Sequence, residues 1–100
     1  MWNHTNSGEE CRFRPNRDVI DTVLGDDEAT LMFLDAKLTY ALNRTGLRIW
    51  RLLKEGRTVG QIVEGLYEEF DVEREQAKEN TLNFIEELLA HKLIVAVNRE

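Results

Sequence analysis

The chain has 100 residues, of which 42% are hydrophobic and 32% are charged, and its formal net charge is −6 at pH 7. A chain of this length forms about one ordinary domain, which buries enough apolar surface to fold without disulfides or a metal. The single cysteine, Cys11, excludes an internal disulfide and a thiolate metal cage, which indicates a reducing, cytoplasmic setting. No apolar run approaches the ~18 residues of a membrane span, and the N-terminal residues lack a signal-peptide pattern, so no membrane partner is expected.

The chain divides by composition into a tail and a domain. Residues 1–16 are polar and aperiodic and include the only proline, which is typical of a flexible tail. From residue 17 to residue 100 the sequence has the periodic apolar pattern of one folded domain. Three short runs with the composition or the alternation of strands come first, at 19–24, 29–34 and 38–42. Because a Gly/Asp turn separates the first two, the pattern predicts an antiparallel meander.

After the third run the hydrophobic period changes to 3.6, the period of an α-helix. Asn43 stands where its side chain can cap a first helix, expected over about 44–55. Thr58 and Gln61 have the spacing of a capping box at the start of a second helix.

A third helix is expected over about 73–91, with Asp71 as its cap, before an apolar strand-like segment at 93–97. Its apolar arc spreads over about 160°, although a core-facing helix needs only about 100°. The arc is therefore either covered on two sides or partly free as a partner site. The fold class predicted is α+β, a winged-helix-like three-stranded antiparallel β-meander followed by a three-helix bundle.

Residues that could carry catalysis are few. The two histidines, His4 and His91, lie far from any patterned carboxylate or nucleophile, and His91 fits the negative end of a helix dipole. The glycines form no phosphate-binding loop, and no cluster of His, Asp or Glu has metal-ligand spacing. The sequence therefore predicts a protein that is not an enzyme and that holds neither metal nor cofactor.

Strands followed by three helices also describe a DNA-binding winged helix, which needs a basic face toward the phosphates. Residues 1–57 carry nine Lys/Arg and nine Asp/Glu, whereas residues 58–100 carry four and ten. The half with the third helix is acidic and would repel a phosphate backbone, so no nucleic-acid partner is expected. Arg44, Arg48 and Arg51 form one stripe on the first helix, as a solvated face or as a docking surface for an acidic partner.

One ordered set of short motifs extends over about sixty residues. It consists of Leu34-Asp35, Tyr40-Ala41-Leu42-Asn43-Arg44-Thr45-Gly46, Ile49-Trp50-Arg51-Leu52-Leu53, Gly56-Arg57-Thr58-Val59 with Ile62, Glu69-Phe70-Asp71-Val72, Phe84-Ile85-Glu86-Glu87-Leu88 and Leu93-Ile94. This combination resembles the PqqD-like family, the small domains known as RiPP recognition elements.

The resemblance implies a winged-helix-like protein that does not read DNA. Members of the family bind the leader segment of a ribosomally made precursor peptide and present it to a modifying enzyme, often a radical SAM protein. In the founding case the product is pyrroloquinoline quinone. The leader lies as an extra strand along the third strand, with apolar side chains in a groove beside the third helix. Carried over to this chain, the site consists of Leu38, Thr39, Tyr40, Ala41 and Leu42 on the strand and Ala77, Lys78, Thr81, Leu82 and Ile85 on the helix.

Physical chemistry supports a peptide site at the third strand. An edge strand has unpaired amides and carbonyls that invite strand addition, and residues 38–42 carry no charge and no proline that would protect the edge. The same edge would allow a homodimer. With a modifying enzyme as a further partner, Arg44, Arg48 and Arg51 are the expected docking residues. The alternative is a winged-helix regulator or a protein-interaction module.

The sequence departs from the family near its end. The family often has glycine before the final apolar pair, where this chain has Lys92. A left-handed helix end there costs a non-glycine residue about 1 kcal/mol.

Overall fold

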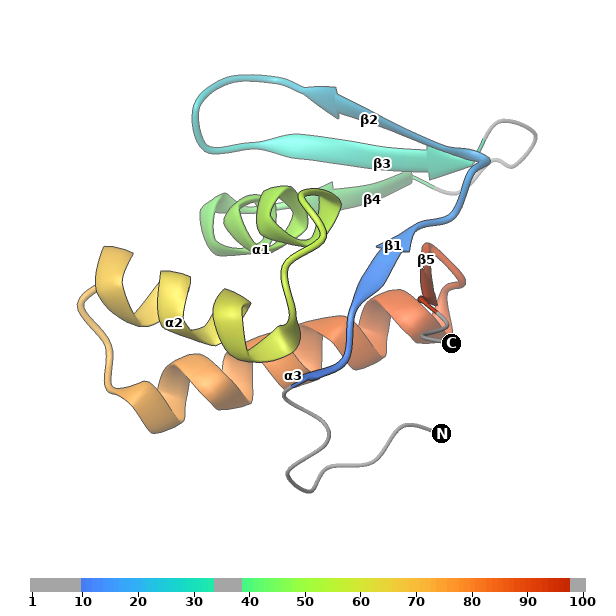
Figure 1. The fold of residues 1–100 in the computed structure, drawn as a ribbon. Coiled ribbons are helices and arrows are strands. Elements are labelled where there is room, and N and C mark those ends of the chain that lie inside the picture. Colours follow the sequence, from blue (N-terminus) through green and yellow to red (C-terminus); the bar gives the residue numbers. More distant parts are fainter. Residues whose placement is uncertain (1–9, 34–38, 98–100) are drawn as a thin grey trace.

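The computed structural model describes residues 10–33 and 39–97. It has a three-stranded sheet on one side of α1 and the helix pair α2 and α3 on the other (Figure 1). This arrangement confirms the α+β fold class, with a meander followed by three helices. The elements in chain order are β1 (Phe13–Pro15), β2 (Val19–Val23), β3 (Ala29–Phe33), β4 (Thr39–Leu42), α1 (Arg44–Lys54), α2 (Val59–Glu69), α3 (Arg74–Ala90) and β5 (Ile94–Ala96).

The main sheet has the order β2-β3-β4, and both pairings are antiparallel. Leu31 pairs with Tyr40 and Ala29 pairs with Leu42, so these side chains share one face of the sheet. Leu31, Ala29 and Leu42 are buried because α1 covers this face with apolar side chains, among them Trp50. Among the described strands β4 pairs with β3 alone, which makes it an edge.

The sheet is also fastened to α1 by a polar link. Asp21, in β2, accepts hydrogen bonds from Trp50 Nε1 and from Lys54 Nζ, each at 2.7 Å. These two donors lower the pKa of Asp21, Lys54 having the larger effect. The carboxylate therefore satisfies the indole N–H of a buried tryptophan while it orients the sheet on the helix.

Residues 13–15 differ from the expected flexible tail. They form β1, which pairs with β5 so that Phe13 lies opposite Ala96, and Phe13 is only 2% exposed. The folded domain thus begins before residue 17. A strand of three residues is too short to show a periodicity, and its partner strand lies at the other end of the chain. The local sequence therefore does not indicate β1.

Two of the three helix starts agree with the expected caps. The Asn43 side chain accepts a hydrogen bond from the Gly46 amide at 2.9 Å, and Thr58 and Gln61 form the complete capping box. The third differs, because Glu73 precedes α3 and makes no side-chain cap. Asp71 lies inside a tight turn in which the Val72 amide donates to the Phe70 carbonyl, so it stands before the helix start.

The end of α3 has the geometry that glycine usually provides. Lys92 has a φ of 62°, in the left-handed region, and its amide donates to the Leu89 carbonyl. The chain then turns directly into β5, where Leu93 and Ile94 are buried. The left-handed helix end is thus present without glycine, at a cost of about 1 kcal/mol. Over the two described ranges no helix is long and apolar enough to cross a membrane.

Candidate functional site

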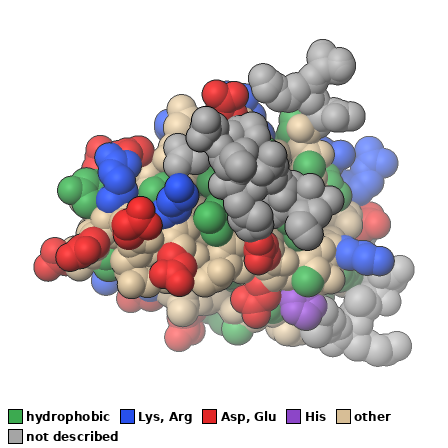
Figure 2. All heavy atoms as spheres, turned by 90° about the horizontal axis from the view of Figure 1, so that it is seen from below, with side chains coloured by type: hydrophobic (Ala, Val, Ile, Leu, Met, Phe, Trp, Pro, Cys, Tyr) green, Lys and Arg blue, Asp and Glu red, His purple; other side chains and the backbone are tan. Residues whose placement is uncertain are grey.

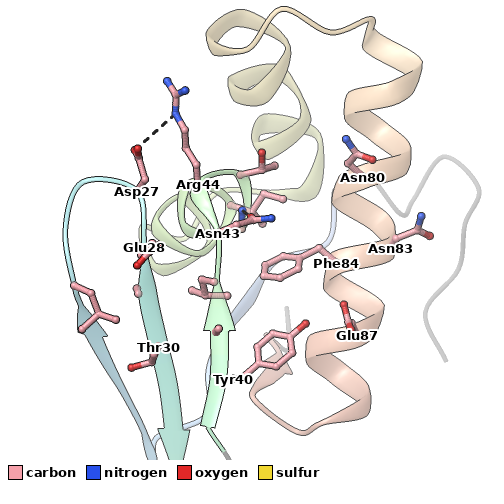
Figure 3. Close-up of a pocket in the computed structure, with 17 residues that line it drawn as sticks. Asp27, Glu28, Thr30, Tyr40, Asn43, Arg44, Asn80, Asn83, Phe84 and Glu87 are labelled. Carbon is pink, nitrogen blue, oxygen red and sulfur yellow. Dashed lines mark hydrogen bonds and ion pairs between the residues drawn. The ribbon is translucent and has the colours of Figure 1, made fainter.

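A groove of about 910 Å³ lies between the edge strand β4 and α3 (Figure 3). We call it the β4–α3 groove. Its other walls are the turn between β2 and β3, the start of β3 and the first turns of α1. The residues that β4 and α3 contribute are Tyr40, Ala41 and Leu42 on one side and Asn80, Asn83, Phe84 and Glu87 on the other.

The floor of the groove is apolar and partly aromatic. Leu42 and Ile49 lie beneath it and are almost fully buried. Phe84 and Tyr40 are half-buried, with their ring centroids 6.4 Å apart. A Cβ atom at Gly46 would lie 3.2 Å from Phe84 Cζ, so glycine at this point of α1 leaves the space that the Phe84 ring occupies. The floor can therefore accept an apolar side chain against two partly exposed rings.

One end of the groove is formed by Tyr40 and Glu87. Burial, the hydrogen bond to Glu87 and the charge of that carboxylate together raise the pKa of Tyr40 to about 12, and burial has the largest effect. The Tyr40 ring also lies 5.5 Å from the His91 ring. At neutral pH Tyr40 is thus an uncharged phenol, oriented toward α3 (Figure 3).

The other end of the groove is charged. Arg44 Nε lies 3.9 Å from Asp27 Oδ1, and the guanidinium lies 5.1 Å from the centre of the Phe70 ring. Glu28 follows Asp27 at the start of β3 and also lines this end. In the residues with described positions, no group of three His, Cys, Asp or Glu side chains could hold a metal ion.

The β4 backbone leaves one edge of the sheet open beside this groove. Among the described strands β4 pairs with β3 alone, and Thr39 and Ala41 are exposed. The amides and carbonyls that point away from β3 therefore have no strand partner within the described residues. Such an edge can accept one more strand, while alternate side chains of that strand reach the groove.

The expected site residues on the strand lie at this groove, since Thr39 to Leu42 form β4 and three of the four line it. Leu38 lies outside the described residues. On α3 the five predicted residues do not line this groove. Ala77, Thr81 and Ile85 belong to the buried core, Leu82 packs against that core, and Lys78 lines a separate pocket of about 120 Å³.

The face of α3 that lines the groove thus lies beside the buried face that carries Ala77, Thr81 and Ile85. Helix positions with the highest apolar content turn toward α2 and the centre of the molecule, because burial there removes the most apolar surface from water. The groove face contains one aromatic residue, Phe84, between polar ones at i, i+3 and i+7: Asn80, Asn83 and Glu87. This pattern is hard to distinguish in sequence from a solvated face.

The arginine stripe, which consists of Arg44, Arg48 and Arg51, has different surroundings at each position. Arg44 lines the groove, and Arg48 Nε lies 2.6 Å from Glu69 Oε1. Arg51 is exposed on the outside of α1. Two of the three cations are therefore paired within the molecule, which leaves Arg51 as the one with the most open surroundings.

Comparison with known proteins gives one family and two solved structures. The family described as Coenzyme PQQ synthesis protein D (PqqD) matches residues 28–94. No curated protein sequence matches the chain. The structure of TbiB1 in complex with the TbiA(beta) leader peptide is similar with a TM-score of 0.77 and 27% identity, covering 86% of this chain and 99% of that one.

Lasso peptide synthetase B1, complexed with its leader peptide, is similar with a TM-score of 0.76 over 84% of this chain and 98% of its own. At 20% identity this second likeness supports the fold alone. The family match covers β3, β4, all three helices and the first residue of β5, and it includes most of the residues around the β4–α3 groove. The chain belongs to the PqqD family.

Proposed function

We propose that this protein binds the leader segment of a ribosomally made precursor peptide in the β4–α3 groove and presents it to a modifying enzyme. The observation that carries the proposal is the open edge of β4, which lies directly beside an apolar, partly aromatic groove. An extended peptide added to this edge makes backbone hydrogen bonds with β4. Its alternate side chains then reach Tyr40 and Phe84.

The comparisons support the same function. TbiB1, which is 27% identical to this chain, was solved in complex with a leader peptide. The likeness to TbiB1 extends over nearly the whole length of that chain. The protein acts here as a non-catalytic chaperone, because its task is to hold a peptide in extended form while another protein modifies it.

A DNA-reading winged helix is the alternative, and the groove side of α3 argues against it. The charged residue that α3 places at the groove is Glu87, and its neighbours Asn80 and Asn83 are uncharged. A helix that enters a DNA groove has to approach phosphates, and this face supplies no cation to release counterions.

The modifying enzyme contacts a second surface, for which we propose the arginine stripe of Arg44, Arg48 and Arg51, in which Arg51 has the most open surroundings. Arg51 is exposed on α1, away from the groove lining, so an enzyme bound there leaves the peptide accessible. Replacing Arg51 by Glu should weaken the complex with the cognate enzyme, measured by analytical ultracentrifugation, while leader binding stays unchanged. An unchanged enzyme complex would show that the stripe is solvated surface.

Calorimetric titration tests the peptide site. The probe is the leader encoded by a short reading frame beside this gene, and we expect roughly micromolar binding with amide NMR shifts centred on β4 and the groove face of α3. The same leader with N-methyl groups on alternate amides of its apolar segment should bind at least tenfold more weakly, because the strand bonds are lost. A scrambled leader is the control. Shifts confined to β1 and β5 would place the peptide elsewhere and contradict the proposal.

A further inference from the structure

We infer that the β4–α3 groove selects leader segments in which basic side chains flank a central apolar residue. This inference rests on the proposed function and specifies the chemistry of its peptide. It is carried by the charges around the groove, by the partners that those charges already have, and by the place of Phe84 between them.

Carboxylates outnumber cations among the described residues that line the groove. The acidic residues are Asp27, Glu28 and Glu87, and the single cation is Arg44. Arg44 is already engaged, because its Nε lies 3.9 Å from Asp27 Oδ1 and its guanidinium lies over the Phe70 ring. The pair formed by Arg44 and Asp27 is close to neutral. The charge that remains for a ligand is that of Glu28 and Glu87.

Neither of the two remaining carboxylates forms an ion pair with a described residue. Glu28 makes no ion pair with any described residue, and Glu87 has as its neighbour the Tyr40 hydroxyl, which is neutral at pH 7. Both side chains are exposed to solvent in the free protein. A docked peptide would partly remove that solvent, so each carboxylate then favours a cation on the peptide.

The carboxylates lie toward opposite ends of the groove. Glu28 precedes Ala29, which pairs with Leu42, so it lies at the Leu42 end of β4. Glu87 lies beside Tyr40, near the other end of the strand. The Phe84 ring lies between these two ends, because its centroid is 6.4 Å from that of Tyr40 and the ring also lies against Gly46, beyond the Leu42 end. Glu28 itself lies at the start of β3, across β4 from α3 (Figure 3). A peptide strand along the open edge of β4 would thus meet Glu87 near one end and the Phe84 ring in the middle, and it would have the charge of Glu28 near its other end, across β4.

The α3 wall adds no cation that would favour an acidic peptide. Asn80 and Asn83 are uncharged, and Asn80 Oδ1 already accepts a hydrogen bond from Gln76 Nε2 at 3.0 Å. The amide group of Asn80 therefore has its N–H donors free for a peptide carbonyl. Figure 2 shows the outer side of α2 and α3, where Asp and Glu side chains lie among Lys and Arg side chains.

The expected preference is moderate and depends on salt. Ion pairs near a protein surface change affinity about two- to fivefold each, and ions screen them over about 8 Å at physiological ionic strength. Charges at the rim of an interface act mainly on the association rate. Each basic flank should therefore improve binding a few-fold, with the larger part of the gain in the association rate.

A positional-scanning library of synthetic twelve-residue peptides tests the inference. Each pool fixes one position as Lys, Gln or Glu around a central Leu, and binding is measured by fluorescence polarisation at low and at physiological salt. The variant is Glu28→Gln with Glu87→Gln. The matched control is Asp26→Asn with Glu79→Gln, which has the same net charge but changes exposed residues that do not line the groove.

For the unmodified protein and the control variant we expect Lys pools to bind best and Glu pools worst at positions flanking the Leu. In the groove variant the difference between Lys and Glu should fall about fourfold or more, while Gln pools keep their affinity. Equal binding of Lys and Glu pools, or an equal loss in the control variant, would overturn the inference and leave the peptide site intact. Absence of binding to every pool and to the cognate leader would contradict both the inference and the proposed function.

Discussion

The two faces of α3 differ in composition and in task. The core face, formed by Ala77, Thr81, Ile85 and Leu88, is at most 1% exposed and lies against the rest of the helix bundle. The groove face is mostly polar and partly open, with Phe84 as its one large apolar side chain. The comparison teaches that apolar density along a helix locates the core. A binding site can then occupy the adjacent, more polar face of the same helix.

The sharpest way to separate the two faces is to damage the core face. Ile85 is 0% exposed, and Ile85→Ala removes three carbon atoms and leaves a cavity. We expect the free energy of unfolding to fall by about 2–5 kcal/mol, measured by urea denaturation. At temperatures where the variant is folded, the affinity for the leader should match that of the unmodified protein. A large affinity loss in the folded variant would show that the two faces are not independent.

The opposite result is expected on the groove face. Phe84→Ala removes a half-buried ring, so stability should fall by only about 1 kcal/mol. Binding of the leader should weaken tenfold or more, because the aromatic floor is lost. Leu82→Ala is the matched control, since Leu82 is also half-buried on α3 but does not line the groove. Leader affinity of both variants is measured by calorimetry. A loss of affinity in Leu82→Ala, and not in Phe84→Ala, would contradict the assignment of the two faces.

A smaller effect should reach the groove face through α1. Gly46→Ala places a methyl group 3.2 Å from Phe84 Cζ, so the ring has to shift. The gain in helix propensity, up to about 1 kcal/mol, offsets part of the strain, and we expect stability to change little. Leader affinity should change several-fold, with altered NMR shifts of the Phe84 ring protons. Unaltered ring shifts would mean that Gly46 does not position Phe84.

The smallest effect concerns the polar link between the sheet and α1 and its dependence on pH. Lys54 and Trp50 hold the pKa of Asp21 below its usual value of 3.8 in the folded protein. The carboxylate binds protons more weakly when folded, so its stabilising effect is complete above about pH 5 and declines as pH falls through the lowered pKa. Asp21→Asn should cost about 1 kcal/mol at pH 7 and progressively less below pH 4. A difference that is the same at pH 3 and pH 7 would contradict this role.

Much of the architecture could be predicted from local sequence. Asn43 and the Thr58 and Gln61 pair mark the first two helix starts, since a cap involves residues only three positions apart. The three-stranded meander follows from alternation and from the Gly/Asp turn. β1 could not be found in this way, because Phe13 pairs with Ala96 at the far end of the chain.

In the candidate site too, one part could be predicted from the local sequence and another part could not. The segment from Leu38 to Leu42, with no charge and no proline, predicted an unprotected strand edge, because the side chains that block strand pairing are read directly from the sequence. The described part of it, Thr39 to Leu42, forms β4. The face of α3 that meets this strand was decided only by tertiary packing. The rotation of a helix is set by all the surfaces that compete for its apolar side chains, and here the core took Ala77, Thr81 and Ile85. Phe84 and Glu87 were thereby left facing β4, in a pairing that neither segment specifies alone.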